Sequence, residues 1–265
     1  MRVGIFDSGL GGLTVVKEIA KVFKGAHIFY IADTQFAPYG EKTKEQILEH
    51  SLDLSNYLIN NHNIDALIVA CNTATSAAIK TLREKFPKLI VIGTEPGIKP
   101  ALNLTISKSI GVLATVATLK GEKYQLLVDK LSCKDEVKLF EQECPGLVEQ
   151  IENGQTRAEK TLQMLEYWLA PMKKNNVDTI VLGCTHYPLV SQSIKNIMGE
   201  NINLIETGFA IAKRLESLSK ETGHTNSGEL EILIYYTGEI NLNMVDDILD
   251  CWKNGGKIVV RNTNG

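Results

Sequence analysis

The feature that most constrains the fold of this chain is an element that occurs twice. Residues 65–73 read DALIVACNT, and residues 178–186 read DTIVLGCTH. Aligned without a gap, the two aspartates match, and Cys71 matches Cys184. Each copy has a short, continuously apolar run, which is typical of a strand covered by helices on both faces. The repeat therefore predicts one structural unit in two copies, with a cysteine at the end of the same strand in each.

Strand-like and helix-like segments alternate along the whole chain. Residues 2–6 (RVGIF) predict a strand, and residues 13–23 predict a helix because their apolar side chains recur at helical spacing. The pattern restarts near residue 108, where IGVLATV resembles the opening VGIFDSG. Such alternation is typical of parallel sheets. We therefore expect an α/β fold of two pseudo-symmetric domains with mainly parallel sheets and an active site in the cleft between them.

The domain boundaries follow from this restart. Residues 1–97 together with 209–265 are predicted to form the first domain, and residues 98–208 the second. On this interpretation the stretch EPGIKPA at 95–101 is the first crossover, and the C-terminal segment returns to complete the first domain. The alternative is that this segment extends the second domain. Two helices are expected to begin with capping boxes, at Thr43 and at Thr156, and a third is expected to begin near Pro188.

Charge and hydropathy argue against several classes of protein. The net charge is −3 and no long Lys/Arg block occurs, so no nucleic-acid or membrane-surface partner is expected. The N-terminus lacks an apolar signal region, and no apolar stretch approaches the roughly 20 residues that span a bilayer. These patterns predict a cytoplasmic protein with no membrane partner.

Five cysteines, an odd number, argue against a disulfide framework in such a chain. No C-x-x-C pair occurs, so a structural metal site is not expected. We expect Cys133, Cys144 and Cys251 to be small buried apolar residues.

Four stretches are candidates for a ligand site, because ligands of open α/β sheets bind outside the carboxyl ends of the strands. They are residues 7–12, 71–76, 114–118 and 183–188, each rich in small or hydroxyl residues before a helix. Helix N-termini attract anions, so a carboxylate or phosphate ligand is suggested; the alternative is that these residues only cap helices. The glycine-rich GLGGLT does not predict a dinucleotide site, since Thr14 stands where a third small residue is needed, and no Walker A motif follows.

The paired cysteines indicate the chemistry. Single-nucleophile catalysis needs one cysteine with one base and gives no reason for a second, symmetry-related cysteine. Inversion of a carbon centre by proton transfer does need two alike groups, one that removes a proton from one face and one that returns a proton to the other. Cys71 and Cys184 are therefore the candidate catalytic residues. Asp7 and His186, each in a turn after a strand, are candidates for tuning the thiols.

The motifs GIFDSGLGGLTVV, APYGEK, ACNTAT, EPGIKPA and LGCTHYPL, in this order, are similar to those of the glutamate racemases of the aspartate/glutamate racemase superfamily. The similarity covers most of residues 3–208. It implies a cofactor-independent isomerase that interconverts L- and D-glutamate and supplies D-glutamate for peptidoglycan, and thus for cell-wall biogenesis and cell shape. It also implies that Cys184 takes the proton from L-glutamate and Cys71 from D-glutamate. Homodimers are usual in the family, so a homodimer is expected.

The same resemblance implies a set of substrate-binding residues: Asp7, Ser8, Tyr39, Gly40, Asn72, Thr73, Thr185 and His186. Thr75, Thr115 and Thr118, in the hydroxyl-rich stretches, complete the predicted set. His186 favours glutamate racemases over aspartate racemases, in which Glu usually stands at this place. Two positions depart from the family pattern, Glu206 in place of Asp and Ala114 in place of Gly.

Three other interpretations remain open at this point. The first is a racemase of aspartate or another amino acid. The second is a non-catalytic carboxylate-binding or regulatory protein, since some family members inhibit DNA gyrase. The third is a cysteine hydrolase. A metal enzyme fits less well, because two thiols without further His ligands make a poor zinc site.

Overall fold

The computed structural model describes residues 1–132, 137–224, 228–250 and 257–263. In these ranges the strands are β1 (Arg2–Asp7), β2 (His27–Ala32), β3 (Ala66–Val69), β4 (Ile90–Gly93), β5 (Ser109–Ala114), β6 (Lys138–Glu143), β7 (Thr179–Gly183), β8 (Asn203–Ile205), β9 (Glu231–Tyr236) and β10 (Lys257–Asn262). The α-helices there are α1 (Leu13–Val22), α2 (Lys44–His62), α3 (Asn72–Lys85), α4 (Ile98–Leu104), α5 (Val116–Leu119), α6 (Glu122–Ser132), α7 (Leu147–Glu152), α8 (Glu159–Lys174), α9 (Ser191–Met198), α10 (Gly208–Glu221) and α11 (Leu242–Leu249). Cys133 and Cys251 lie outside the described residues.

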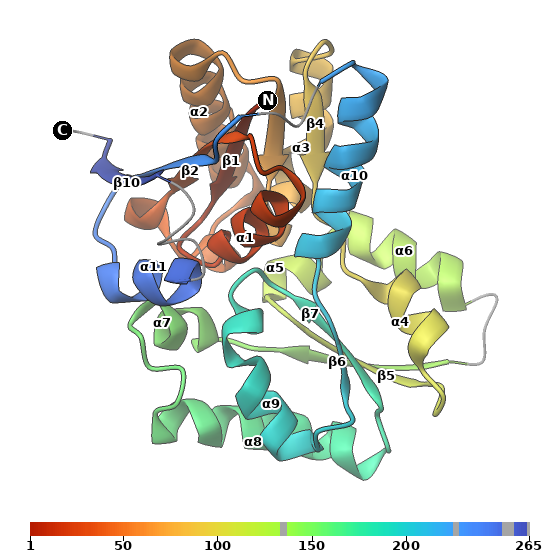
Figure 1. The fold of residues 1–265 in the computed structure, drawn as a ribbon. Helices are drawn as coiled ribbons and strands as arrows, with labels where there is room; N and C mark the ends of the chain where they lie inside the picture. Colours follow the sequence, from red (N-terminus) through yellow and green to blue (C-terminus); the bar gives the residue numbers. More distant parts are fainter. Residues whose placement is uncertain (133–136, 225–227, 251–256, 264–265) are drawn as a thin grey trace.

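The strands form two sheets. One has the order β10-β9-β2-β1-β3-β4 and the other the order β6-β5-β7-β8. The strand pairs of both sheets are parallel. The sheets lie one above the other in Figure 1, with the first at the top and the second at the bottom. The predicted α/β class with two domains and parallel sheets is confirmed.

The repeat seen in the sequence is a repeat of topology. The order β2-β1-β3-β4 in the first sheet is the order β6-β5-β7-β8 in the second, so β3 and β7 are equivalent strands. The repeated aspartates make equivalent hydrogen bonds at the start of these strands. Asp65 accepts one from the backbone N–H of Arg2 at 2.7 Å, and Asp178 accepts one from the backbone N–H of Ser107 at 2.7 Å. Each aspartate thus holds the amino end of the neighbouring strand, and the cysteines at the other end of β3 and β7 occupy matching places.

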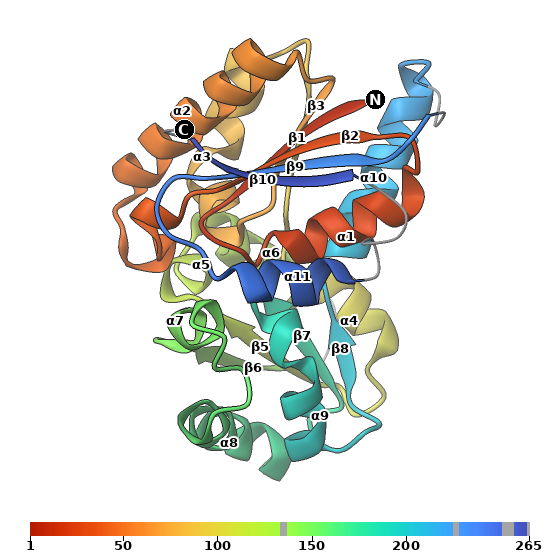
Figure 2. The same cartoon turned by 60° about the vertical axis from the view of Figure 1, so that its left-hand side comes forward.

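Helices cover both faces of each sheet, as the apolar strands require. Alternate side chains of β1 point to opposite faces: Ile5 packs in a cluster with α1, α10 and α11, whereas Phe6 packs with α2 and α3. Figure 2 shows these two groups of helices on either side of the upper sheet. The second sheet packs against α8 and α9 on one face and against α4, α5 and α6 on the other.

The chain crosses between the sheets after β4 and returns after β8. The predicted crossover at 95–101 holds the start of α4, and α10 begins directly after the return. β9 then pairs with β2, and β10 pairs with β9, so the C-terminal strands extend the first sheet. Where one domain ends and the other begins remains a prediction. No helix in the described ranges is long and apolar enough to cross a membrane.

One of the two predicted capping boxes is confirmed. Thr43 Oγ1 accepts from the N–H of Gln46 at 3.3 Å, and the Gln46 side chain accepts from the N–H of Thr43 at 3.1 Å. The one predicted at Thr156 is wrong, because α8 begins three residues later and its N-cap, Ala158, makes no side-chain cap. Thr161, in the first turn, instead donates to the carbonyl of Gln155 at 2.6 Å.

The helix expected near Pro188 is split in two. A 3-10 turn at Tyr187–Val190 comes first, and α9 follows it.

Candidate active site

A cleft lies where the carboxyl ends of the two sheets face each other. It encloses about 620 Å³ of space not filled by atoms, the open solvent at its mouth included. Ten of the predicted site residues line it: Ser8, Tyr39, Gly40, Cys71, Asn72, Thr73, Thr115, Cys184, Thr185 and His186. Asp7, Thr75 and Thr118 lie outside this lining. The structure thus brings residues from both halves of the sequence into one cavity.

Cys71 is the N-cap residue of α3, as the sequence predicted from its position before a helix. Its Sγ atom accepts a hydrogen bond from the N–H of Ala74 at 3.4 Å and lies 4.0 Å from Oγ of Ser8. Burial is the main cause that raises the pKa of the Cys71 thiol, and the nearby carboxylate of Asp7 raises it further; the Ala74 hydrogen bond opposes both. Cys71 is therefore held as a thiol near neutral pH.

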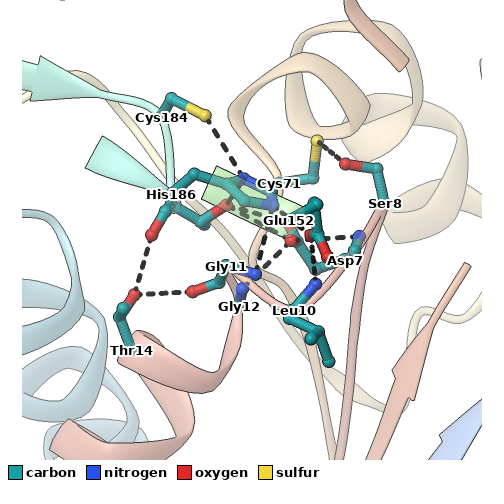
Figure 3. A network of polar contacts seen from close by, with 12 residues as sticks. Asp7, Ser8, Leu10, Gly11, Gly12, Thr14, Cys71, Glu152, Cys184 and His186 are labelled. Atoms are coloured by element: carbon teal, nitrogen blue, oxygen red, sulfur yellow. Dashed lines mark hydrogen bonds and ion pairs between the residues drawn. The ribbon is translucent and has the colours of Figure 1, made fainter. Parts of the chain in front are cut away.

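Cys184 has different surroundings, although it follows the equivalent strand. It comes directly after β7, but the N-cap of the following 3-10 turn is His186 and not the cysteine. Sγ of Cys184 lies 3.6 Å from Nδ1 of His186, and Figure 3 shows this contact across the cleft from Cys71. The neighbour of Cys184 is thus a titratable ring, whereas those of Cys71 are a hydroxyl and a backbone amide.

His186 is bound at its other nitrogen by Glu152, a residue of α7. Nε2 of His186 lies 2.5 Å from Oε1 of Glu152, and the same oxygen accepts from the N–H of Leu10 at 2.6 Å. The N–H of Gly11 also points to Nε2 at 3.2 Å, but that contact needs an unprotonated nitrogen, so the shorter contact with the carboxylate prevails. The chain Glu152–His186–Cys184 is a continuous line of polar contacts (Figure 3).

The charges in this line favour an ion pair. Burial lowers the pKa of His186, but its contacts with Cys184 and Glu152 raise the pKa more, and the net result lies well above the ordinary value. Burial raises the pKa of Glu152, but the hydrogen bond to His186 and that from Leu10 bring it below its ordinary value. An imidazolium bound to a carboxylate follows, with Nδ1–H directed at the Cys184 sulfur.

Asp7 lies behind the cleft wall, at the end of β1. Its carboxylate accepts from the N–H of Gly12 at 3.0 Å and from the hydroxyl of Thr185 at 3.2 Å. The pKa of Asp7 is raised mainly by its complete burial, and the charge of His186 opposes this. Asp7 therefore joins the first sheet to the loop that carries Cys184 and His186, and its charge acts on Cys71 without a direct contact.

The glycine-rich loop at 7–12 has a steric purpose. A Cβ atom on Gly11 would lie 2.5 Å from Nδ1 of His186, and one on Gly9 would lie 2.1 Å from Oε1 of Glu152. Contacts this short are excluded for real side chains, so the His186 ring and the Glu152 carboxylate from the second domain pack directly on the backbone of the first. The two glycines permit that approach, which accounts for a motif that matches no dinucleotide fingerprint.

Neutral polar groups lie beside the carboxyl groups of Glu41 and Glu149 in the rest of the cleft wall. Asn72 is buried, and neither atom of its amide lies within hydrogen-bond distance of another protein group. Tyr39 is held by its hydroxyl, which donates to Asp33 at 2.5 Å. Oγ1 of Thr73, from the first domain, lies 3.0 Å from Oγ1 of Thr115, from the second. These donors suit a carboxylate ligand.

Two predicted binding residues use their hydroxyls on protein partners. Thr75 donates to the carbonyl of Val69 at 3.1 Å and accepts from the N–H of Thr94 at 3.1 Å. Thr118 lies 2.9 Å from Thr115, oxygen to oxygen. Neither residue lines the cleft, and a substrate-binding role for each remains a prediction.

Sequence reasoning missed the loop after β6. This loop brings Cys144, Glu149 and, at the end of α7, Glu152 to the site. The signal was the position of the loop, because the carboxyl end of β6 faces the same cleft as the other four stretches. Cys144 is buried, as expected, and it also lines the cleft.

The two departures from the family pattern lie away from the cleft lining. Ala114 is the last residue of β5. A Cβ atom on Gly183 would lie 2.8 Å from the Cβ of Ala114, so glycine is required at position 183, directly before Cys184. Glu206 contacts the hydroxyl of Ser191 at 3.5 Å. Within the described ranges, no three His, Cys, Asp or Glu side chains are grouped as a metal ion would require.

Comparison with known proteins agrees with this geometry. The profile of the Asp/Glu/hydantoin racemase family matches residues 5–215. The glutamate racemase of Sulfurovum sp. is 62% identical over 256 residues, which are 96% of this chain and 97% of that protein. That of Aliarcobacter butzleri is 64% identical over 250 residues, 94% of this chain and 96% of that protein.

Solved structures give the same result. A glutamate racemase isoform from Bacillus anthracis superimposes with a TM-score of 0.84 at 30% identity, covering 98% of this chain and 96% of that one. The Escherichia coli glutamate racemase was solved with L-glutamate and the activator UDP-MurNAc-Ala. It superimposes with a TM-score of 0.83 at 29% identity, covering 98% of this chain and 97% of that one. With matching topology, a cleft between two equivalent cysteine-bearing strands, and a family profile over most of its length, this chain belongs to the Asp/Glu/hydantoin racemase family.

Proposed function

We propose that this protein is a glutamate racemase that interconverts L- and D-glutamate by proton transfer between two cysteines, without a cofactor. The observation that carries the proposal is the placement of Cys71 and Cys184. They follow equivalent strands of two sheets and line the same cleft, one from each domain. The names of relatives that are more than 60% identical support glutamate as the substrate.

In the direction from L- to D-glutamate, a Cys184 thiolate removes the proton on Cα. The electron pair of the broken C–H bond spreads into the α-carboxylate, where neutral donors such as Asn72 and the backbone amides at the start of α3 stabilise the added charge. The Cys71 thiol then gives its proton to the opposite face of Cα. The enzyme finishes with a Cys184 thiol and a Cys71 thiolate, which is the arrangement needed for the reverse reaction.

The surroundings of the two thiols support these two roles. An imidazolium at His186, held by Glu152, directs Nδ1–H at Sγ of Cys184, the sulfur that removes the proton in this direction. Burial and Asp7 keep the pKa of Cys71 above its ordinary value, so Cys71 rests as the proton donor. This arrangement suits removal of the proton of L-glutamate by Cys184 and its replacement by Cys71.

Uncharged groups bind the two substrate carboxylates in this proposal. In the described part of the chain, the cleft lining has no Lys or Arg, and its neutral polar groups include Asn72, Thr73 and Thr115, with Ser8 beside Cys71. Hydrogen bonds from neutral donors hold an anion more weakly than a salt bridge does. This suits an enzyme whose product carries the same charges as its substrate and must leave.

The test is incubation of the purified protein with L-glutamate in D2O without added cofactor, following optical rotation and loss of the α-proton together. We expect rotation to decay to zero as deuterium replaces the α-proton. Cys71→Ser and Cys184→Ser should each lower the rate by at least about 10²-fold, because a hydroxyl is a far weaker acid and base than a thiol. No change with glutamate or aspartate in the wild type would overturn the proposal.

The two variants also separate racemisation from hydrolysis. A hydrolase would need one cysteine as nucleophile and would tolerate loss of the other. Because the two enantiomers have equal free energy, kcat/KM must fall equally in both directions for each variant. A residual activity that depends on only one cysteine would contradict the two-base mechanism.

Supply of D-glutamate for peptidoglycan and cell shape, a cytoplasmic location and a homodimer remain part of the proposal. Light scattering after gel filtration tests the last of these, since one chain has a mass of 29.3 kDa and a dimer twice that. Depletion of the protein in its host should be rescued by added D-glutamate if the cell-wall role is correct.

A further inference from the structure

The amide of Asn72 lies between two cavities. One is the cleft; the other is a small cavity behind it, between α3, the end of β4 and α6, which Thr94 also lines. Asn72 is 6% exposed, and neither Oδ1 nor Nδ2 is within hydrogen-bond distance of a protein partner. A buried amide with both ends unpaired is costly, and native proteins satisfy such groups with a ligand or an ordered water.

Thr94 is the second unpaired group at this place. It is 2% exposed, and its Oγ1 has no hydrogen-bond partner in the protein. Its backbone is fixed, because its N–H donates to Thr75 Oγ1 at 3.1 Å and Thr75 in turn donates to the carbonyl of Val69. Thr75 thus ties the ends of β3 and β4 together and sets the position from which the Thr94 hydroxyl reaches the small cavity.

Two of the other hydroxyls around this cavity, which Ser76 also lines, are used elsewhere. Thr118 is bound to Thr115 at 2.9 Å, and Tyr124 donates to Glu141 at 2.6 Å. The polar groups left without a partner, Thr94 and the Asn72 amide, therefore share one cavity. A water in a buried polar site typically makes about three hydrogen bonds, and these two groups supply both a donor and acceptors for it.

The chemistry of the substrate decides which way the amide turns. A carboxylate only accepts hydrogen bonds, so Nδ2 of Asn72 must face the cleft and Oδ1 must face the small cavity, where it needs a donor. We propose that Thr94 is a positioning residue for substrate binding: a buried water bridges its hydroxyl to Oδ1 of Asn72 and holds Nδ2 towards the substrate carboxylate. This inference rests on the proposed function.

The test is a double-mutant cycle with Thr94→Val, which keeps the shape of the side chain and removes the hydroxyl, and Asn72→Ala. With L-glutamate, we expect Thr94→Val to raise KM by roughly fivefold, the worth of one net hydrogen bond, with kcat changed less than about twofold. Thr94→Ser restores the hydroxyl and should keep the wild-type KM. In the Asn72→Ala background, Thr94→Val should have no further effect on KM, because the amide it positions is gone.

The matched control is Thr161→Val, which removes another fully buried hydroxyl, on α8. It should lower the melting temperature without changing KM, and so separates loss of stability from loss of positioning. If Thr94→Val does not fold, Thr94→Ala takes its place in the cycle. A KM unchanged by Thr94→Val, or effects of the two substitutions that simply add, would overturn the inference.

Failure of this inference differs from failure of the proposed function. Wild-type protein that does not racemise glutamate refutes the function, whereas wild-type racemisation with an additive cycle refutes only the role of Thr94. A crystal structure at high resolution supplies a direct check. Density for a water within hydrogen-bond distance of both Thr94 Oγ1 and Asn72 Oδ1 is the expected result, and a dry cavity would contradict it.

Discussion

Cys184 and His186 contact each other in the cleft, with 3.6 Å between Sγ and Nδ1. Two residues apart in sequence, they lie in the turn that follows β7, so the main chain itself sets their separation. Glu152 then orients the ring from α7, and the N–H of Leu10 orients Glu152 from the first domain. The acid–base pair is therefore complete only when the two domains lie against each other as they do in this structure.

Glu152→Gln should lower kcat by roughly 10²-fold, the low end of the usual range for general acid–base catalysis. The glutamine keeps the size of the side chain but removes the charge that raises the pKa of His186. The imidazolium then loses its proton at lower pH, so the alkaline limb of the pH–rate profile should move towards neutral pH. Racemisation rates from pH 6 to 10 measure this.

The control for that substitution is Glu166→Gln, the same change at an exposed position of α8. It should leave both kcat and the pH profile as in the wild type. A Glu152→Gln profile that keeps its alkaline limb would show that Glu152 does not set the protonation of His186.

Gly11→Ala should abolish most activity, because the new Cβ would lie 2.5 Å from the His186 ring and the ring must move. A shift of the ring changes its distance to Cys184, and misplacement by about 1 Å can cost roughly 10²-fold in rate. Circular dichroism and kcat together test this: native secondary structure with lost activity is expected. Full activity would mean that the loop relaxes without disturbing the ring.

Thr115→Val should raise KM for glutamate by roughly fivefold through loss of one hydrogen bond. Its hydroxyl lies 3.0 Å from that of Thr73 in the opposite domain, so the change also removes a contact between the domains. Thr222→Val, at an exposed position after α10, is the matched control and should have no effect on KM. Equal KM values for the two variants would contradict a role for Thr115 in the closed cleft.

Asp178→Asn should destabilise the fold in a way that depends on pH. Burial raises the pKa of Asp178, but hydrogen bonds from Thr105, Ser107 and Ile106 lower it more, to about 2. A depressed folded-state pKa contributes stability above the ordinary value of about 4, and that contribution is lost as pH falls towards 2. The difference in melting temperature between wild type and variant should therefore be a few degrees at pH 7 and shrink below about pH 4.

The equivalent substitution Asp65→Asn provides the comparison in the other domain. Asp65 accepts from the N–H of Arg2, whereas Asp178 accepts from the hydroxyls of Thr105 and Thr179 and from two backbone N–H groups before β5. We expect the smaller loss of melting temperature for Asp65→Asn. A larger loss would mean that the count of accepted hydrogen bonds does not govern this position.

Several features of the site were predictable because they depend on local pattern. A continuous apolar run gives a strand, the end of a parallel strand is where ligands bind, and a cysteine placed there twice implies two alike groups facing one cavity. Two helix starts depend only on residues a few positions apart. They are the N-cap of α3 at Cys71 and the capping box of Thr43 and Gln46 at α2. The prediction of a capping box at Thr156 was wrong because α8 begins at Glu159, after a turn that the local pattern does not determine.

The sequence by itself determined the α/β class, the internal repeat and the two cysteines, because each is written in the spacing of neighbouring residues. Only the tertiary structure decided that Glu152 holds His186, that Thr75 serves the ends of two strands and not the cleft, and that Gly11 makes room for a ring from the other domain. Those contacts join positions that are 6 to 175 residues apart. Their geometry depends on how two independently patterned sheets pack against each other, and no local period in a sequence encodes that packing.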